Sequence, residues 1–171
     1  TNSLNGKSYT VTAIADKAFR NTSSNGEITS ITLPDSLKEI GDFAFFSCLK
    51  LEDINLPDGL TKIGYQAFQN CYSLTEITIP SSVTTMGSHV FNRCTGLKEV
   101  TFEKNSQLSA LPDATFANCI SLESFTLPNG FASIGENAFY KCGKLTTLNI
   151  SDDVTEIKKD AFIDCAKFNT I

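Results

Sequence analysis

The chain repeats a short sequence unit at a nearly fixed period. Its six cysteines mark that period, because they follow one another at intervals of 23, 23, 25, 23 and 23 residues: Cys48, Cys71, Cys94, Cys119, Cys142 and Cys165. A period of about 20 to 30 residues is typical of solenoids, in which one structural unit is stacked many times and contacts only its neighbours. The function of such a chain must be sought on the surface that the stack presents.

Aligning the units on this period gives the consensus L-x-x-I-G-x-x-A-F-x-x-C-x-x-L-x-x-I-x-L-P-x-x. The units start near Val11, Leu37, Leu60, Val83, Leu108, Phe131 and Val154. The first unit has Thr22 in the Cys position, and the fourth has two extra residues after Phe102, which accounts for the interval of 25. We expect one solenoid domain over residues 1–171, and a fragment of a longer chain, because Ile171 falls inside the seventh unit.

Each unit contains three segments with different patterns. The stretch from Leu74 to Ile79 alternates apolar and polar residues as a strand with one buried face does, and Pro80 ends it. The stretch from Leu60 to Gly64 is too short for a helix and predicts a second short strand or bridge, with the glycine turning the corner. The spacing of A-F-x-x-C suits one helical or 3₁₀ turn. The pattern therefore predicts an α/β repeat solenoid, a right-handed leucine-rich-repeat coil of about seven 23-residue units.

Stacking the units aligns identical side chains into columns. The largest column is a phenylalanine spine, which comprises Phe19, Phe45, Phe68, Phe91, Phe116, Phe139 and Phe162. Burying each ring contributes on the order of 1.5 to 3 kcal/mol, so we expect the spine to be the largest apolar contribution to the core.

The cysteines invite a disulfide or a metal site, but their geometry favours neither. Cysteines one period apart would have parallel Cα–Cβ bonds, with Cβ atoms near 5 Å apart rather than the usual 3.8 Å of a disulfide. A zinc site would need four converging ligands, and the chain has no C-x-x-C pair and only one histidine. We expect small buried thiols that fill the same space in every coil, with no metal and no cofactor.

Charge and hydropathy exclude several classes of partner. The chain has 14 basic and 19 acidic residues and a pI near 4.8, so it lacks the positive field that collects nucleic acid or acidic lipid. No apolar run approaches the roughly 20 residues that cross a bilayer, so we expect no membrane insertion within these residues.

The motif A-F-x-x-C-x-x-L-x-x-I-x-L-P preceded by L-x-x-I-G, as in Leu60 to Pro80, resembles the BspA-like class of leucine-rich repeats. The resemblance covers about Val11 to Ile171. It implies secreted or surface-exposed proteins, several of them implicated in adhesion to host proteins or other cells. It implies no enzyme activity, and it carries over no functional residues, because the repeated positions are core positions.

Acidic residues on consecutive units form the first candidate binding surface, which we call the acidic strip. It comprises Asp53, Glu76 and Glu99, with Glu52 and Glu123 one residue upstream of the same column. Like charges about 5 Å apart repel by roughly 0.8 kcal/mol even in water, so the strip costs stability unless solvent, Lys98 or a ligand offsets the repulsion. One hypothesis is that it receives a basic partner, and the alternative is an ordinary solvated face.

An aromatic group at variable positions is the second candidate surface: Phe43, Phe46, Tyr65 and Tyr72. Other units place polar residues at equivalent sites, so the coil does not require these rings. They either form an exposed patch that anchors a protein or stacks on a sugar, or pack over neighbouring turns.

Enzyme activity is not expected. The single histidine, His89, has no sequence-local partners for a catalytic triad, and we expect it at the surface. Two classes of function remain: an extracellular or cell-surface module that binds a host or cell-surface protein or a glycan, and a structural spacer. The outward Thr and Asn residues of the strands, such as Thr78 and Asn55, form a uniform ladder that favours the spacer.

Overall fold

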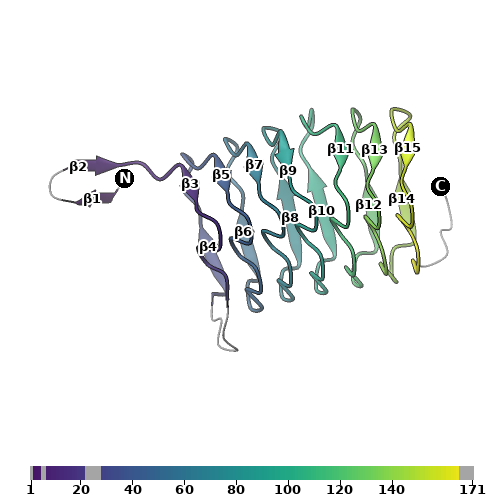
Figure 1. Ribbon diagram of the computed structural model, residues 1–171, viewed down its shortest axis with the longest axis horizontal. Helices are drawn as coiled ribbons and strands as arrows, with labels where there is room; N and C mark the ends of the chain where they lie inside the picture. Colours follow the sequence, from purple (N-terminus) through teal and green to yellow (C-terminus); the bar gives the residue numbers. More distant parts are fainter. Residues whose placement is uncertain (1, 5–6, 22–27, 166–171) are drawn as a thin grey trace.

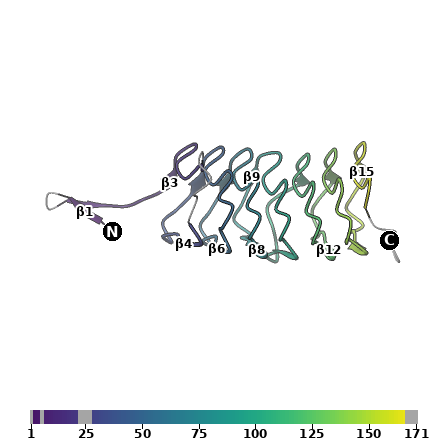
Figure 2. The same cartoon turned by 90° about the horizontal axis from the view of Figure 1, so that it is seen from below.

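The computed structural model describes residues 2–4, 7–21 and 28–165. They form a parallel β-solenoid of about six coils, each about 23 residues long, in which every coil stacks on the next (Figure 1). A hairpin of β1 (Asn2–Leu4) and β2 (Lys7–Tyr9) precedes the coils and stands away from them (Figure 2).

The main sheet is built from the stretch that the alternating pattern predicted. Its strands are β4 (Ser30–Thr32), β6 (Asp53–Asn55), β8 (Glu76–Ile79), β10 (Glu99–Phe102), β12 (Ser124–Thr126) and β14 (Thr147–Asn149). Parallel hydrogen-bonded ladders join them in pairs, β4 with β6, β8 with β10 and β12 with β14. The ladder lapses between β6 and β8 and again between β10 and β12, so the sheet is a row of strand pairs.

The second side of each coil is a two-residue strand, which confirms the short strand predicted from L-x-x-I-G. These strands are β3 (Ala13–Ile14), β5 (Glu39–Ile40), β7 (Lys62–Ile63), β9 (Thr85–Met86), β11 (Ala110–Leu111), β13 (Ser133–Ile134) and β15 (Glu156–Ile157). They form two parallel sheets, β3-β5-β7-β9 and β11-β13-β15, which are separated where the fourth unit carries its two extra residues.

The third side contradicts the sequence-based prediction, because the described residues contain no helix. The α/β class and the helical turn are therefore wrong. The A-F-x-x-C segment instead makes successive turns, as in the bonds from the Phe46 and Cys48 amides to the carbonyls three residues back (3.1 Å each). Residues at two positions of the unit take a left-handed φ of 50 to 64°. They are Lys17, Phe43, Gln66, His89, Ala114, Asn137 and Asp160 before the Ala position and, from the second unit on, Ser47, Asn70, Arg93, Asn118, Lys141 and Asp164 before the Cys position.

This alternation of φ has a physical reason. It turns every second amide along the axis of the stack, so that Phe43, Phe45 and Ser47 donate to carbonyls of the next coil at 2.7 to 2.8 Å. A helix directs its amides along its own axis and could not bond to the neighbouring coil in this way. Hydrogen bonding between coils therefore outweighs the steric cost of left-handed residues.

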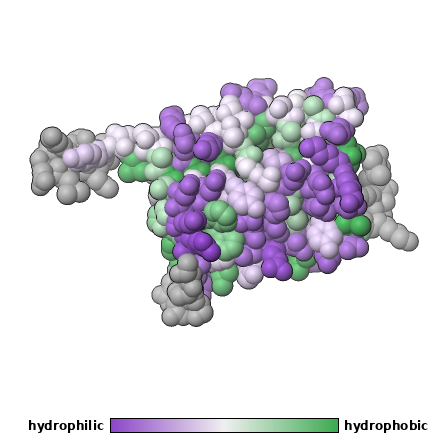
Figure 3. All heavy atoms as spheres, viewed as in Figure 1, coloured by the Kyte–Doolittle hydropathy of each residue, from purple (hydrophilic) through white to green (hydrophobic). Residues whose placement is uncertain are grey.

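The core confirms the phenylalanine spine. Its rings stack with centroids 5.1 to 5.7 Å apart, and the five rings from Phe45 to Phe139 are fully buried. Phe19, at the first coil, is 36% exposed. The apolar residues are thus largely enclosed, and the face in Figure 3 is mostly hydrophilic with only small apolar patches.

The cysteines are free thiols, and all but the half-buried Cys165 are buried. Each donates its S–H to the carbonyl of a spine phenylalanine in the preceding coil, for example Cys94 Sγ to Phe68 O at 3.2 Å. The contact recurs from Cys48 to Cys165 at 3.0 to 3.4 Å. Each thiol therefore fills space as expected and also satisfies a carbonyl. Thr22, which replaces the first cysteine, lies outside the described residues.

The consensus glycine serves close approach between coils. A Cβ on Gly64 would lie 2.5 Å from the backbone carbon of Gly41, and no left-handed φ is needed there. The sequence therefore identified the right position but the wrong reason. Glycine is needed there because the neighbouring coil leaves no room for a Cβ, and not because the turn needs its conformational freedom.

Candidate functional site

The acidic strip lies along the main sheet, at the start of its strands. Asp53, Glu76 and Glu99 are the first residues of β6, β8 and β10, and all five strip residues are exposed. Glu76 and Glu99 are register partners on paired strands. The structure thus brings together the carboxylates that the sequence placed in one column.

No ion pair relieves the charge of the strip. The three ion pairs within the described part of the chain lie elsewhere, at Lys62–Glu39, Lys158–Asp113 and Lys159–Asp160. Since Glu76 and Glu99 are neighbours in a parallel ladder, their repulsion is of the order of a few tenths to one kcal/mol, about what two charges 5 Å apart experience in water. A cationic ligand would relieve that repulsion.

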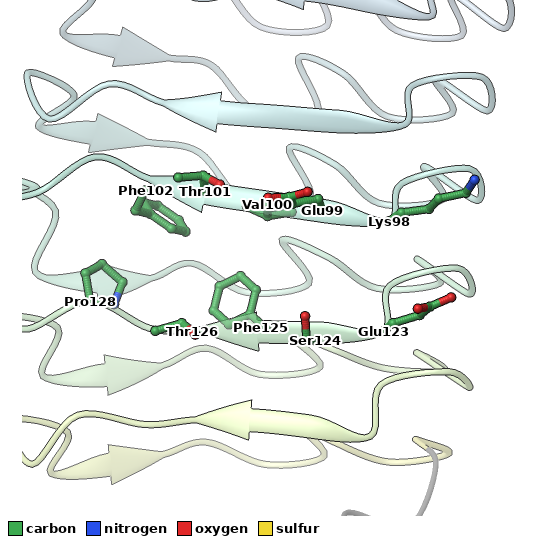
Figure 4. Close-up of a pocket in the computed structure, with 10 residues that line it drawn as sticks. All are labelled: Lys98, Glu99, Val100, Thr101, Phe102, Glu123, Ser124, Phe125, Thr126 and Pro128. Atoms are coloured by element: carbon green, nitrogen blue, oxygen red, sulfur yellow. The ribbon is translucent and has the colours of Figure 1, made fainter.

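A hollow of about 640 Å³ lies beside the end of the strip, between β10 and β12 (Figure 4). It lies where no hydrogen-bonded ladder joins β10 to β12, and the two extra residues of the fourth unit are in the segment that connects these strands. That insertion is held in place, because Glu103 Oε2 accepts a hydrogen bond from the Ser81 amide at 2.9 Å. The residues that line the hollow are Lys98, Glu99, Val100, Thr101, Phe102, Glu123, Ser124, Phe125, Thr126 and Pro128.

The two ends of the hollow differ in chemistry. Lys98, Glu99 and Glu123 lie at the end where the strands begin (Figure 4). The rings of Phe102 and Phe125 extend from the two strands into the space between them, near Pro128 (Figure 4). These two rings meet edge to face with centroids 6.1 Å apart. The sequence analysis identified the two glutamates but not the aromatic end of the hollow. The only feature of the sequence that pointed to this region was the interval of 25 residues between Cys94 and Cys119.

The aromatic group is divided between two places. Phe43, Phe46 and Tyr65 are in contact on the turn side, with ring centroids 5.7 Å apart for Phe43 and Phe46 and 5.4 Å for Phe43 and Tyr65. The Arg20 guanidinium lies 5.2 Å from the Phe46 ring. Phe43 and Phe46 are half-buried and Tyr65 is 38% exposed, so the rings both pack on one another and reach the surface.

Tyr72 lines a separate notch of about 340 Å³ on three successive coils. It is 42% exposed, and Ile120 on the far side is 49% exposed. Thr95 occupies the equivalent position of the coil between them, and Arg93 and Asn118 complete the lining. The notch arises because the small Thr95 lies between the larger Tyr72 and Ile120. Its lining combines an aromatic ring with a guanidinium, an amide and a hydroxyl group.

His89 is half-buried, which departs from the expected surface position. Its ring meets that of Tyr65 with centroids 5.7 Å apart, and its Nδ1 is buried without a hydrogen-bond partner in the described structure. Among the described residues, no carboxylate forms an ion pair with the imidazole or a hydrogen bond with its Nδ1 that would orient it as a general base.

Burial makes several of the thiols poor nucleophiles. Burial raises the pKa of the Cys48 thiol to about 11, and burial also raises the pKa of Cys71 and of Cys119. A buried thiol with a raised pKa carries little of the thiolate that nucleophilic chemistry or metal binding needs. Among the residues described, no three His, Cys, Asp or Glu side chains are grouped as a metal site requires.

Comparison with known proteins identifies the repeat. The model of the BspA type leucine rich repeat region, in six copies, matches residues 12–111 and 103–171. The chain belongs to this family. The BspA-type assignment confirms the resemblance seen in the sequence, and repeats of this family are generally non-enzymatic scaffolds, with no catalytic activity indicated here.

Several bacterial leucine-rich repeat structures are similar to this BspA-type chain. One from Bacteroides ovatus is 28% identical with a TM-score of 0.71, over 97% of this chain and 48% of that one. The pneumococcal vaccine antigen PcpA is 30% identical with a TM-score of 0.71, over 94% of this chain and 39% of that one. A protein from Bacteroides capillosus is 39% identical with a TM-score of 0.52, over 60% of this chain and 71% of that one.

The chain therefore spans about half, or less, of the first two of these proteins. A search of curated proteins gave no match. The described residues include no helix long and apolar enough to cross a bilayer.

Proposed function

We propose that this BspA-type array is a non-enzymatic interaction module of a cell-surface or secreted protein, and that it mediates adhesion by binding a host or cell-surface protein. The family supports a protein-binding scaffold. Similarity to PcpA, described as a vaccine antigen, supports an exposed location, because antibodies act outside the cell.

The observation that carries the proposal is the exposed acidic strip on the main sheet. Its five carboxylates lie outside every ion pair of the described structure, and two of them are register partners. Selection for stability alone would not favour unpaired like charges at neighbouring positions. A partner with a basic surface would gain both attraction and faster association from this strip.

Charge reversal tests the proposal. Glu76→Lys with Glu99→Lys should lower binding to basic extracellular matrix proteins by about tenfold or more, as expected when one or two charged contacts are lost. The matched control is Glu136→Lys with Glu156→Lys, which makes the same change in net charge at exposed positions away from the main sheet. Biolayer interferometry at two salt concentrations measures both pairs. Equal binding by the wild type and both variants would refute a role for the strip.

Two alternatives each have an observation in their favour. A glycan-binding module is favoured by the notch at Tyr72, whose lining of ring, guanidinium, amide and hydroxyl suits a sugar. A structural spacer is favoured by the exposed Thr and Asn ladder of the main sheet, which is aligned in register, as at Thr78 and Thr101. A glycan array with Tyr72→Ala separates the first alternative, and absence of any ligand for the intact array would favour the second.

A further inference from the structure

We propose that the hollow between β10 and β12 binds an extended peptide segment of the partner. The segment would place a basic side chain beside Glu99 and Glu123 and an apolar side chain against Phe102 and Pro128. The proposal rests on the proposed function, since it assigns a partner chemistry and a place to the interaction surface.

The lapse in the ladder favours a peptide as the occupant. β10 is hydrogen-bonded to β8 on one side and β12 to β14 on the other, but no ladder joins β10 to β12. Backbone amides and carbonyls on the facing edges of β10 and β12 are therefore not used in a ladder with each other, and those that the hollow exposes can bond to a ligand that carries amides and carbonyls of its own. Main-chain hydrogen bonding at an unpaired strand edge is a common mode of peptide recognition, and side-chain pockets supply its specificity.

The charge at the polar end of the hollow favours a basic side chain of the partner. Glu99 and Glu123 contribute two carboxylates and Lys98 one ammonium group, so this end has an excess of negative charge. None of the three takes part in an ion pair of the described structure. An arginine or lysine of the partner would balance the excess, whereas an acidic residue would add to it.

The apolar end is preorganised. Phe125 is 2% exposed and holds Phe102 edge to face, and Phe102 also contacts the Phe131 ring at 5.4 Å. Phe102 itself remains half-buried, so part of its ring is open to the hollow. A fixed, partly exposed ring offers apolar contact at little cost in side-chain entropy.

The spacing of the two ends defines the partner further. Glu99 and Phe102 are the first and last residues of β10, which places the ends about 10 Å apart at roughly 3.3 Å per residue. An extended peptide covers that span with two residues between its basic and its apolar side chain. The outward hydroxyls of Thr101, Ser124 and Thr126 lie between the ends and suit the polar backbone of such a peptide.

Nuclear magnetic resonance titration of the ¹⁵N-labelled chain tests this site. The probe is a short synthetic peptide with arginine and leucine separated by two threonines, and the controls replace arginine by glutamate or leucine by serine. The arginine–leucine peptide should shift the amides of Thr101, Ser124 and Thr126 and bind about tenfold more tightly than either control. Equal affinity for all three peptides, or stronger shifts from a chitin trisaccharide, would overturn the proposal.

The repeat supplies a matched pair of variants. Ser124 in β12 and Thr147 in β14 are register partners and both are exposed, but only Ser124 lines the hollow. Ser124→Arg should fill the hollow and lower peptide affinity by about tenfold, while Thr147→Arg should change it by less than about twofold. Equal effects of the two variants would contradict the site. Glu99→Gln with Glu123→Gln, which preserves shape, should give the same loss if Ser124→Arg impairs folding.

Failure of this inference can be told apart from failure of the proposed function. Glu52→Gln with Glu76→Gln removes two of the three strip carboxylates that do not line the hollow. If that pair lowers binding to matrix proteins while Ser124→Arg does not, the hollow is not the site and the proposed function stands. If neither lowers binding, both proposals fail.

Discussion

Removing one ring from the middle of the phenylalanine spine tests how the coils are held together. Phe91 is 0% exposed and lies between Phe68 and Phe116, with centroids 5.5 and 5.6 Å away and ring planes within 7°. Phe91→Ala should therefore cost about 3 to 5 kcal/mol, the range for a large ring replaced by alanine in a core. Of that, each stacking contact accounts for about 0.5 to 1.5 kcal/mol.

The end of the spine provides the comparison. Phe19 is 36% exposed and stacks on Phe45 alone, so Phe19→Ala should cost only about 1 to 2 kcal/mol. The difference, about 2 kcal/mol or more, corresponds to roughly 4 to 8 °C in Tm for a chain of this size. Phe91→Leu keeps most of the volume and should cost about 1.5 kcal/mol.

Urea unfolding followed by circular dichroism measures all three variants. Phe91→Ala should also lower the dependence of the unfolding free energy on urea, because a weakened central coil lets the two halves of the array unfold separately. If Phe91→Ala shifted the midpoint no more than Phe19→Ala, the idea that stacked rings couple the coils would be refuted.

Two further predictions concern the backbone and the thiols. Gly64→Ala should cost about 1 to 3 kcal/mol because its Cβ would meet the Gly41 backbone at 2.5 Å, whereas Gly143→Ala, with nothing within 4 Å, should be nearly neutral in the same urea experiment. Burial raises the pKa of Cys48 to about 11, above its value in the unfolded chain, so this thiol stabilises the fold below pH 9 and loses that contribution as the pH rises toward 11. Stability measured from pH 8 to 11 should fall less steeply in Cys48→Ala, and an identical slope would contradict the assignment.

The repeated apolar positions made most of the fold predictable. Alternation around Ile77 and Ile79 located the main strand, and the period alone aligned the spine. The turn side was not predictable, because the left-handed residues there differ widely in type, from Phe43 to Asp160. Their conformation is imposed by hydrogen bonds to the next coil, and a local spacing of A-F-x-x-C carries no information about those bonds.

Three units have another residue at the consensus glycine position, and contacts between coils explain two of these replacements. Ala15 replaces the glycine in the first coil, where no earlier coil approaches it, and Pro112 replaces it where β9 and β11 are unpaired. The close contact that excludes a Cβ at Gly64 is absent from such positions. Lys158 also replaces the glycine, and nothing in the structure explains how the last coil accommodates it.

The candidate site follows from the one place in the described coils where the main ladder and the short-strand ladder are both interrupted. In a perfect array every coil would offer the same surface, and a partner could bind at any of several equivalent registers. The two extra residues after Phe102 remove that equivalence, since both the main and the short-strand ladders are interrupted there. In the coil after this step the first residue of the strand is Ser124 instead of a carboxylate, and the nearest carboxylate, Glu123, is one residue upstream. A regular scaffold thus acquires a single distinct position, and specific recognition requires such a position.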